Sequence, residues 1–432
     1  MKPSIAFHTL GCKVNQYDTQ AMAERFAQAG YREVPFDQEA DIYLVNTCTV
    51  TGTGDRKSLQ LARRLKREHP SSTLIMCGCL AQKVGEALLE CGADLIVGTQ
   101  FRNDVVSLLE ETRSSGVARC AVEPLPPVMP YEELHITRQH DHTRAVMKIQ
   151  EGCNNRCTYC IIPSVRGPIR SRPLADIGAE ARRLRDAGFR EIVLTGIHLS
   201  SYGLDFSPRG SLLDVIGLLQ SMEGIERIRL GSLEPVVATE SFAASLARCS
   251  KVCPQFHLAL QSGSDAVLRR MKRRYNTDQF LAAVNHLRAC YPHAAFTTDL
   301  LTGFPGETED EFMETARMID LVGFARVHVF PYSPREDTPA AAMPGQLSPA
   351  EKEARARRLI ALGKQATRRY LESWIGESAE ILPEEKAGGC WEGYTPEYIR
   401  VRMPSGVELR QGIPVRVLLT SVEGQKMFAK AI

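Results

Sequence analysis

The sequence of 432 residues predicts an α/β protein made of three folded regions. Short β-rich runs alternate with helix-like segments over residues 1–113 and again over residues 145–347, a pattern typical of parallel sheets covered by helices. Residues 374–432 lack this alternation and show short strands broken by Gly and Pro. We therefore expect an N-terminal doubly wound parallel α/β domain, a central partial (β/α)6 barrel and a C-terminal OB-like β-barrel.

The first region, residues 1–113, has the alternation of a doubly wound sheet. We expect its strands at residues 4–10, 41–46, 73–77 and 94–97, with helices between them. Residues 114–144 follow and carry prolines at positions 124, 126, 127 and 130. Because such a composition disfavours regular elements, we expect this segment to be a linker between domains.

The central region, residues 145–347, carries six successive strand and helix units. The strands are expected at residues 145–150, 191–196, 227–230, 256–261, 295–301 and 326–330, and helices at residues such as 174–187 and 309–321. This order predicts the partial barrel, whose chemistry would lie at the C-terminal ends of the strands. A basic helix over residues 348–373 would connect it to the last barrel, with strands near residues 398–403 and 415–419.

The composition is that of an ordinary globular protein, with 44% hydrophobic and 24% charged residues. Lys and Arg number 53 against 51 Asp and Glu, so the net charge of +2 by itself indicates no acidic partner. No apolar run approaches the roughly 18 residues that span a bilayer, and the N-terminus lacks the apolar segment of a signal peptide. We expect a cytoplasmic protein that does not contact a membrane.

The 13 cysteines are the unusual feature of the composition. They are too sparse for a disulfide scaffold, and their odd number excludes complete pairing. In a reducing compartment, clustered cysteines indicate metal or redox chemistry more often than disulfides.

Three cysteines are spaced as C-x3-C-x2-C directly after the first expected barrel strand: Cys153, Cys157 and Cys160. Three thiolates suit an iron–sulfur cluster that normally takes four ligands, and the missing ligand leaves one iron open to a substrate. A structural zinc site is the alternative, but it would need a fourth ligand nearby, and the next candidate is His198.

A second set lies in the first region: Cys12, Cys48 and Cys79. Each follows the C-terminal end of one of the first three expected strands, the edge at which doubly wound sheets bind ligands. We expect the three thiols to meet in one crevice, although each could instead be a small core residue. Cys77 is expected in the core, and packing or surface roles are expected for Cys91, Cys120, Cys249, Cys253, Cys290 and Cys390.

The C-x3-C-x2-C spacing, with Tyr159 before the last cysteine, is similar to the radical S-adenosylmethionine signature. Two cysteine triads and an OB-like end together resemble the methylthiotransferase family of radical enzymes, over nearly the whole chain. Further matching motifs include Leu194-Thr-Gly-Ile-His, Leu258-Ala-Leu-Gln-Ser-Gly-Ser, Gly303-Phe-Pro-Gly-Glu-Thr and Phe330-Pro-Tyr-Ser-Pro-Arg. The terminal module is similar to the TRAM domain, an RNA-binding barrel.

This resemblance implies two 4Fe-4S clusters and S-adenosyl-L-methionine as cofactors. The cluster held by Cys153, Cys157 and Cys160 would chelate S-adenosylmethionine through its free iron and generate a 5′-deoxyadenosyl radical. An auxiliary cluster held by Cys12, Cys48 and Cys79 would supply or hold the sulfur. One S-adenosylmethionine would provide the methyl group and another the radical.

Under this resemblance, four residues at the ends of barrel strands would contact S-adenosylmethionine: Gly196, Glu234, Gln261 and Asp299. Glycine permits close backbone approach, and carboxylate or amide groups can accept hydrogen bonds from ribose or the amino group. Each could instead tie a loop to its strand. Tyr159 would pack near the adenine or shield the cluster.

The residues of the motifs around Cys12 and Cys153 are most similar to those of one branch of the family. That branch adds a methylthio group to C2 of N6-threonylcarbamoyladenosine at position 37 of tRNA. The alternatives are N6-isopentenyladenosine in tRNA, an aspartate of a ribosomal protein, or a noncatalytic RNA-binding iron–sulfur redox sensor. The implied partners are the tRNA anticodon loop, an electron donor such as a flavodoxin-type protein, and a sulfur source.

Basic clusters provide the physical signal for RNA. Six cations lie within residues 56–67 and five within residues 269–274, and more follow along the helix at Arg355, Arg357, Arg358, Lys364, Arg368 and Arg369. Phosphate contacts require such patches, although a solvated helix face is the ordinary explanation of each. Residues 370–432 hold 7 Lys and Arg against 9 Asp and Glu, so RNA binding there would depend on a local face with Arg400, Arg402, Arg410 and Arg416. Trp391 or Tyr394 could stack on bases or belong to the core.

Overall fold

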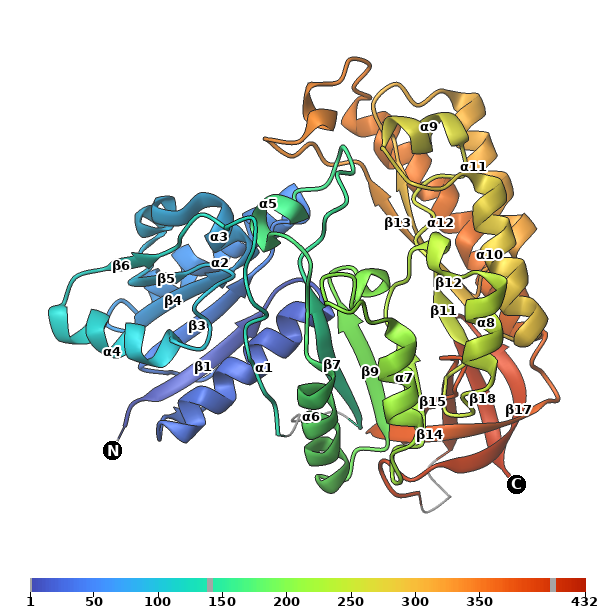
Figure 1. The fold of residues 1–432 in the computed structure, drawn as a ribbon, viewed down its shortest axis with the longest axis horizontal. Helices are drawn as coiled ribbons and strands as arrows, with labels where there is room; N and C mark the ends of the chain where they lie inside the picture. Colours follow the sequence, from blue (N-terminus) through green and yellow to red (C-terminus); the bar gives the residue numbers. More distant parts are fainter. Residues whose placement is uncertain (1, 138–142, 405–408) are drawn as a thin grey trace.

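A computed structural model describes residues 2–137, 143–404 and 409–432 and shows three folded regions side by side (Figure 1). The first is a parallel sheet of order β2-β1-β3-β4-β5-β6. Its strands are β1 (Ser4–Thr9), β2 (Arg32–Glu33), β3 (Ile42–Thr47), β4 (Thr73–Gly78), β5 (Leu95–Val97) and β6 (Arg119–Ala121). The parallel α/β fold is confirmed. The short strands β2 and β6 are additional, and β6 lies in the segment expected to be a linker.

Helices cover both faces of this sheet, as a doubly wound fold requires. Met22 and Phe26 of α1 (Lys13–Gln28) pack with Val105 and Leu109 of α4 (Val105–Ser115) in one core. The opposite face is covered by α2 (Gly52–Glu68), α3 (Cys79–Val84) and the 3-10 helix η1 (Gly85–Cys91). The loops after β1, β3 and β4 therefore lie at one edge of the sheet.

The central strands follow one another in chain order as an open barrel. One sheet has the order β10-β9-β7-β8 and another the order β11-β12-β13, and parallel bridges from Ile228 to Val252 and from Leu233 to Leu258 join them. The strands are β7 (Arg144–Glu151), β8 (Arg170–Ser171), β9 (Glu191–Gly196), β10 (Arg227–Leu230), β11 (Gln255–His257), β12 (Ala295–Thr302) and β13 (Arg326–Pro331). Among the described residues β7 does not pair with β13, so the partial barrel is confirmed.

Strand β11 is shorter than the expected 256–261 because the backbone leaves the extended conformation before Gln261, whose φ is +66°. The antiparallel strand β8, which the sequence analysis does not predict, pairs only with the end of β7. A two-residue strand carries too few side chains to show a period of two.

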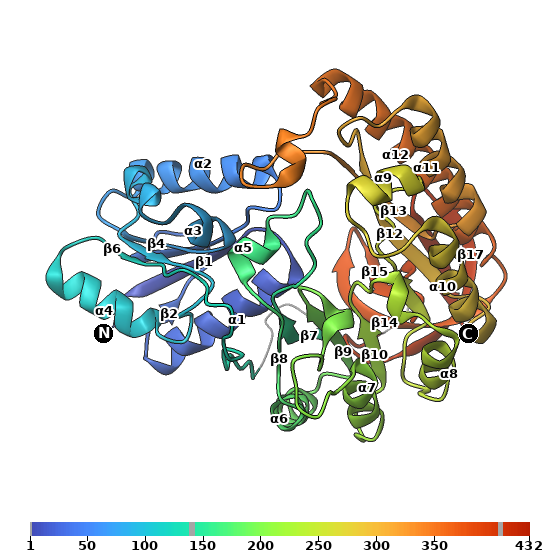
Figure 2. The same cartoon turned by 45° about the horizontal axis from the view of Figure 1, so that its top comes forward.

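The central region carries long helices on the outside of the barrel and short helices in its loops (Figure 2). They are α5 (Ile162–Arg166), α6 (Leu174–Asp186), η2 (Leu199–Ser201), α7 (Leu212–Gln220), η3 (Pro235–Val237), α8 (Glu240–Ala247), α9 (Asp265–Arg270), α10 (Thr277–Cys290), α11 (Glu309–Val322), η4 (Pro339–Ala342) and α12 (Pro349–Glu372). The expected connecting helix is α12, and its Leu359 and Ala366 are buried in the main core. It therefore belongs to the outer layer of the barrel as well as connecting two regions.

The last region is a closed five-stranded barrel of order β14-β15-β16-β18-β17, as expected for an OB-like module. Its strands are β14 (Ser378–Ala387), β15 (Cys390–Tyr394), β16 (Arg400–Pro404), β17 (Val415–Glu423) and β18 (Lys426–Ala431). Val401, Met403, Val417 and Leu419 fill its interior.

The central barrel contacts a different region at each end. Arg229 of β10 donates to the carbonyl of Pro396 at 2.7 Å, and Arg227 donates to Glu380 at 2.8 Å, so the terminal barrel covers the N-terminal ends of the strands. At the side, Tyr17 of α1 donates to the carbonyl of Leu134 at 2.8 Å and joins the main core. The first region thus packs beside the open edge at β7. Across the described parts of the chain, no helix is both long and apolar enough to cross a membrane.

Candidate functional site

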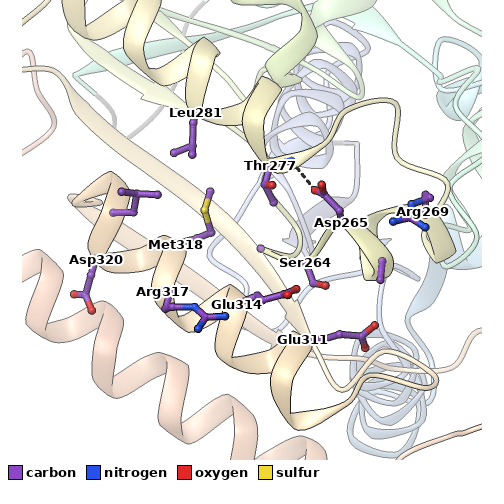
Figure 3. A pocket seen from close by; sticks show the side chains of 13 residues that line it. Ser264, Asp265, Arg269, Thr277, Leu281, Glu311, Glu314, Arg317, Met318 and Asp320 are labelled. Carbon is purple, nitrogen blue, oxygen red and sulfur yellow. Dashed lines mark hydrogen bonds between the residues drawn. The ribbon is translucent and has the colours of Figure 1, made fainter.

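A hollow of about 920 Å³ on the outer face, between α9, α10 and α11, contains none of the candidate residues (Figure 3). Its charged wall comes mainly from α11, with Glu311, Glu314, Arg317 and Asp320. The C-terminal strand ends, where α/β folds carry their chemistry, lie elsewhere. We therefore build the site from the loops that carry the cysteines.

The first cysteine loop connects β7 to α5. Gly152 starts it with a φ of +70°, and a Cβ at this position would lie 1.8 Å from the carbonyl oxygen of Pro168. The amide of Cys153 donates to Gly167 at 3.0 Å, and the amide of Cys160 donates to Cys157 at 3.1 Å. The loop therefore holds all three thiols of this triad at the end of β7.

Polar groups surround this loop and are directed at its sulfur atoms. Arg273 donates from Nη1 to Sγ of Cys157 at 3.2 Å, and the amide of Asn155 lies 3.4 Å from Sγ of Cys153. Arg273 also pairs with Glu234 at 3.1 Å through Nη2. N–H donors favour the thiolate form, which is the form that binds metal.

Burial opposes the ionisation of these thiols in the absence of a metal. Burial, together with the neighbouring Cys157 and Cys153, raises the pKa of Cys160 to about 12. Burial likewise raises the pKa of Cys153. A bound metal displaces such protons, so this group of thiols suits a metal centre better than a set of free thiolates.

The second triad lies at the edge of the first sheet. Cys12 precedes α1 after β1, Cys48 follows β3, and Cys79 begins α3 after β4. A Cβ on Gly11 would lie 2.8 Å from Cβ of Cys48, so the first two loops touch. Burial, together with the nearby Cys12 and Cys48, raises the pKa of Cys79 to about 11. The structure therefore brings the three thiols into one crevice.

A buried arginine joins the two triads. Arg166 ends α5, which directly follows the loop of Cys160, and it is fully buried. Its Nε donates to Sγ of Cys79 at 3.1 Å, and Ile161 and Val165 pack against Cys79. Helix α5 thus connects the loop of the first triad to Cys79 of the second.

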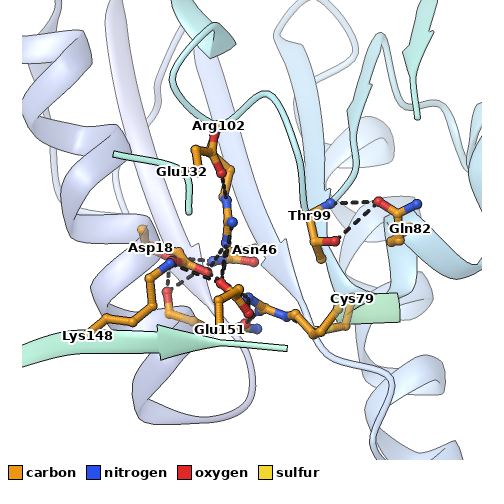
Figure 4. Close-up of polar contacts among 12 residues, drawn as sticks. Asp18, Asn46, Cys79, Gln82, Thr99, Arg102, Glu132, Lys148 and Glu151 are labelled. Carbon is orange, nitrogen blue, oxygen red and sulfur yellow. Dashed lines mark hydrogen bonds and ion pairs between the residues drawn. The ribbon is translucent and has the colours of Figure 1, made fainter. Parts of the chain in front are cut away.

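Arg166 is part of a charge network between the first region and the barrel. Figure 4 shows the other members of this network, Asp18, Glu151, Arg102 and Lys148. Nη1 of Arg166 donates to Asp18 at 3.0 Å and to Glu151 at 3.1 Å. Arg102 and Lys148 contact the same two carboxylates, and all five side chains are almost completely buried. Burial acts to raise the pKa of Asp18, but Arg102, Lys148 and Arg166 outweigh it and lower that pKa.

The last barrel loop closes against the loop of Cys48. Ser333 accepts a hydrogen bond from the amide of Gly52 at 3.2 Å. Arg335, which is almost fully buried, donates to Thr49 at 2.7 Å and pairs with Asp55. Loops from both ends of the barrel sheet therefore reach the crevice of the second triad.

Two of the expected S-adenosylmethionine contacts already have partners within the protein. A Cβ on Gly196 would lie 2.9 Å from Cβ of Gln150, so the packing of β9 against β7 alone requires glycine here. Glu234 is 5% exposed and accepts from Asn155 at 3.2 Å and from His198 at 3.1 Å. Through Asn155 it positions the first cysteine loop.

Of the other three expected contacts, Gln261 and Asp299 lie farther round the barrel, and Tyr159 lies in the first cysteine loop. Asp299 of β12 pairs with His257 at 3.4 Å, and its side chain is 34% exposed. Gln261 pairs through its backbone with Asp299 and Leu301. Tyr159 is half-buried against Phe304, with ring centroids 6.5 Å apart. Their contact with S-adenosylmethionine stays a prediction.

The thiols fit clusters better than single ions. Within the described ranges, no three His, Cys, Asp or Glu side chains are close enough to hold one ion. An iron–sulfur cluster binds each thiolate through a different iron, so its ligands need not converge on one point. Two triads, each with a buried arginine donating to one sulfur, fit two clusters with three protein ligands each.

The remaining cysteines have other surroundings. Cys77 is fully buried in the core under the sheet, as expected, and all 13 cysteines are free thiols. Sequence reasoning missed Arg166, Arg273, Asn155 and Asp18. Only Arg273 stands in a basic cluster that the sequence analysis noted, and nothing local indicated that it would reach a cysteine.

Comparisons with known proteins identify two family regions and full-length relatives. Residues 147–319 match the Radical SAM superfamily, and residues 4–98 match the uncharacterized protein family UPF0004. The chain is 43% identical to the threonylcarbamoyladenosine tRNA methylthiotransferase MtaB of Bacillus subtilis, over 92% of this chain and 90% of that protein. It is 34% identical to the MtaB of Thermotoga maritima, over 98% of this chain and 96% of that protein.

A relative named for a different substrate is also similar. The tRNA-2-methylthio-N(6)-dimethylallyladenosine synthase of Mycobacterium bovis is 36% identical over 87% of this chain and 75% of that protein. Among solved structures, the radical S-adenosylmethionine methyltransferase TsrM of Kitasatospora setae matches with a TM-score of 0.57 and 14% identity, over 79% of this chain and 77% of that chain. This last likeness concerns the fold alone.

Proposed function

This chain belongs to the methylthiotransferase family of radical S-adenosylmethionine enzymes, and we propose that it adds a methylthio group to C2 of N6-threonylcarbamoyladenosine at position 37 of tRNA. As a family member it is an enzyme that uses S-adenosylmethionine and 4Fe-4S clusters. The observation that carries the proposal is the position of the two cysteine triads on either side of α5. Radical formation and sulfur insertion both need to occur close to one substrate carbon.

We assign the two triads different roles. Cys153, Cys157 and Cys160 would hold the cluster that binds S-adenosylmethionine, and Cys12, Cys48 and Cys79 would hold the auxiliary cluster. When bound, these groups supply the radical, the sulfur and the methyl group. The protein contributes the shared interface, in which Arg166 and Arg273 each donate a hydrogen bond to one ligand sulfur.

A cation beside the second triad supports the threonylcarbamoyl substrate. Lys13 directly follows Cys12, and its side chain is exposed without a hydrogen bond or ion pair to any other described residue. Desolvation by the surrounding protein lowers the pKa of Lys13, while Arg144 and Arg229 on one side and Tyr398 and Glu191 on the other have opposing effects, so Lys13 itself is the cation that this place offers to a ligand. A threonylcarbamoyl group carries a carboxylate that would pair with such a cation, whereas an isopentenyl group is a hydrocarbon.

We further propose the partners and regions that this reaction needs. Residues 1–113 would carry the auxiliary cluster, residues 145–347 the radical chemistry and residues 374–432 an RNA-binding barrel. An electron donor of flavodoxin type and a sulfur source would act with the enzyme in the cytoplasm. Each cleavage of S-adenosylmethionine consumes one electron, so a reductant is required.

Mass spectrometry of nucleosides from tRNA tests the substrate. In a strain that lacks this protein, the methylthio form of threonylcarbamoyladenosine should be lost while that of isopentenyladenosine stays. Reintroduced wild-type protein should restore it, and Lys13→Ala should restore less than Lys13→Arg does.

The opposite pattern would refute the proposal. Loss of the methylthio mark on isopentenyladenosine, with the threonylcarbamoyl mark unchanged, would assign the chain to the other substrate. Equal restoration by Lys13→Ala and wild type would remove Lys13 from substrate recognition.

A further inference from the structure

One face of α2 carries a concentration of exposed cations: Arg56, Lys57, Arg63, Arg64 and Arg67. At about 100° per residue, these five positions fall within roughly 120° of the helix circumference. The opposite side packs Ala62 and Leu65 into the core. The cations therefore form a single stripe toward solvent.

The basic helix α12 is largely neutralised within the protein, whereas Arg269, Lys272 and Arg274 of the cluster at residues 269–274 are exposed and have no ion pair with another described residue. On α12, Arg355 pairs with Glu307 at 2.6 Å and Arg358 pairs with Glu309 at 2.7 Å. Arg368 pairs with Glu372 at 2.7 Å, and Arg357 and Arg369 also have carboxylate partners. The positive charges of these α12 arginines are therefore balanced by carboxylates of the protein itself.

Three cations of the terminal barrel are neutralised in a similar way, while Arg410 and Arg416 have no ion pair with another described residue. Arg402 and Lys426 lie 3.0 Å and 2.9 Å from the buried carboxylate of Glu392, and Arg400 pairs with it as well. Trp391 is buried, and Tyr394 stacks on Tyr398 with ring centroids 4.7 Å apart. These aromatic rings are engaged in packing, so they are poorly placed to stack on bases.

The stripe on α2 keeps its charge. Glu68 is the one carboxylate that pairs with it among the described residues, at 3.8 Å from Arg64 and 3.5 Å from Arg67, with all three side chains largely exposed. Asp55, also on α2, forms its ion pair with Arg335 and not with the stripe. Five cations and one carboxylate leave four net positive charges on one helix face, which is the electrostatic footprint of a phosphate backbone.

The position of α2 connects this stripe to the candidate site. The helix begins at Gly52, four residues after Cys48, and the amide of Gly52 donates a hydrogen bond to Ser333. Its 17 residues extend for about 25 Å away from that loop. Figure 2 shows its first turn beside the segment that contains η4. A nucleic acid strand along the stripe would therefore lead into the crevice of the second triad.

We propose that the exposed face of α2 binds the phosphate backbone of the substrate tRNA beside the modified loop. This inference rests on the proposed function for the identity of the RNA. It assigns the main electrostatic contact to the first region, whereas the resemblance to TRAM domains would place it on the terminal barrel.

Binding of tRNA to the cluster-loaded full chain tests this proposal. The triple variant Arg56→Gln, Lys57→Gln and Arg63→Gln removes three unpaired cations from exposed helical positions. At about 0.15 M salt the Kd for tRNA carrying threonylcarbamoyladenosine should rise on the order of 10- to 100-fold. The slope of log K against log salt should become shallower by about 2 to 3.

A matched control removes the same charge from α12 with Arg357→Gln, Arg368→Gln and Arg369→Gln, at three exposed positions. Its Kd should stay within about twofold of the wild type, because these side chains lie outside the stripe. Melting temperature and iron content of both variants report whether folding and cluster loading are intact.

The outcomes separate this proposal from the function on which it rests. Tight binding by the wild type, with equal binding by the α2 variant, would overturn the role of α2 and leave the proposed function standing. An equal loss in the α12 control would also overturn it, since the effect would then follow total charge. A wild type that binds no tRNA would refute both proposals.

Discussion

Two arginines differ from the other cations of the molecule because each donates a hydrogen bond to a cysteine sulfur. Arg166 contacts Cys79 at 3.1 Å, and Arg273 contacts Cys157 at 3.2 Å. Hydrogen bonds to cluster sulfurs stabilise the reduced, more negative state and so raise the reduction potential. We infer that each arginine adjusts the potential of the cluster on its own side of α5.

Substitution by lysine keeps the charge and removes the guanidinium geometry. Arg166→Lys should lower the reduction potential of the auxiliary cluster by roughly 50–100 mV, equivalent to about 1–2 kcal/mol for one electron. Arg273→Lys should do the same for the other cluster. Redox titration followed by electron paramagnetic resonance measures both potentials, and each variant serves as the control for the other. Unchanged potentials would show that the contacts are only structural.

At the scale of elements, each triad depends on its own strand-end loops. Cys157→Ala should abolish S-adenosylmethionine cleavage, because its loop follows β7 and holds the radical-generating cluster. Cys48→Ala, in the loop after β3, should spare cleavage and stop sulfur insertion. Each variant should retain roughly half of the iron, since one cluster of two is lost.

Product analysis after anaerobic reconstitution distinguishes the two loops. Formation of 5′-deoxyadenosine by Cys157→Ala would contradict its assignment. Continued methylthiolation by Cys48→Ala would remove the second triad from the reaction. Iron quantification confirms in each case that the other cluster is present.

On the scale of the whole molecule, buried charges hold the first region against the barrel. Asp18 of α1 meets Arg166 of α5 and Lys148 of β7 inside this interface. Breaking one partner of a buried ion pair leaves an uncompensated charge, so Asp18→Asn should destabilise the protein by about 3–5 kcal/mol at pH 7. The exposed Asp186→Asn is the control and should cost less than about 0.5 kcal/mol.

The same network predicts an acid dependence. The folded-state pKa values of Asp18 and Glu151 lie below their ordinary values, because the neighbouring Arg102, Lys148 and Arg166 outweigh the cost of burial. Their stabilisation is therefore complete above pH about 4 to 5 and is lost as the pH falls through the lowered pKa values. Thermal unfolding of wild type and Asp18→Asn from pH 7.5 downward should show their difference shrinking only below about pH 4. A difference that disappears near pH 6 would contradict this assignment.

The local sequence determined the elements and the candidate cysteines. Strands β9 and β10 lie at the residues that the pattern predicts, because a buried strand is visible in its own run of apolar and β-branched side chains. The three cysteines of the C-x3-C-x2-C spacing are seven positions apart at most, so one loop brings them together. The three-residue strand β6 was not predicted because it is too short to show a period.

Only the tertiary structure decided which distant groups meet and which charges stay free. Arg166 and Cys79 are separated by 87 positions, and Arg335 and Thr49 by 286. Such contacts arise from the packing of whole regions, and no local pattern encodes them. The sequence likewise shows basic clusters on α2, α12 and the terminal barrel alike. Carboxylates neutralise the arginines of α12 and three cations of the terminal barrel, whereas among the described residues the exposed face of α2 has only Glu68 beside it and keeps its charge.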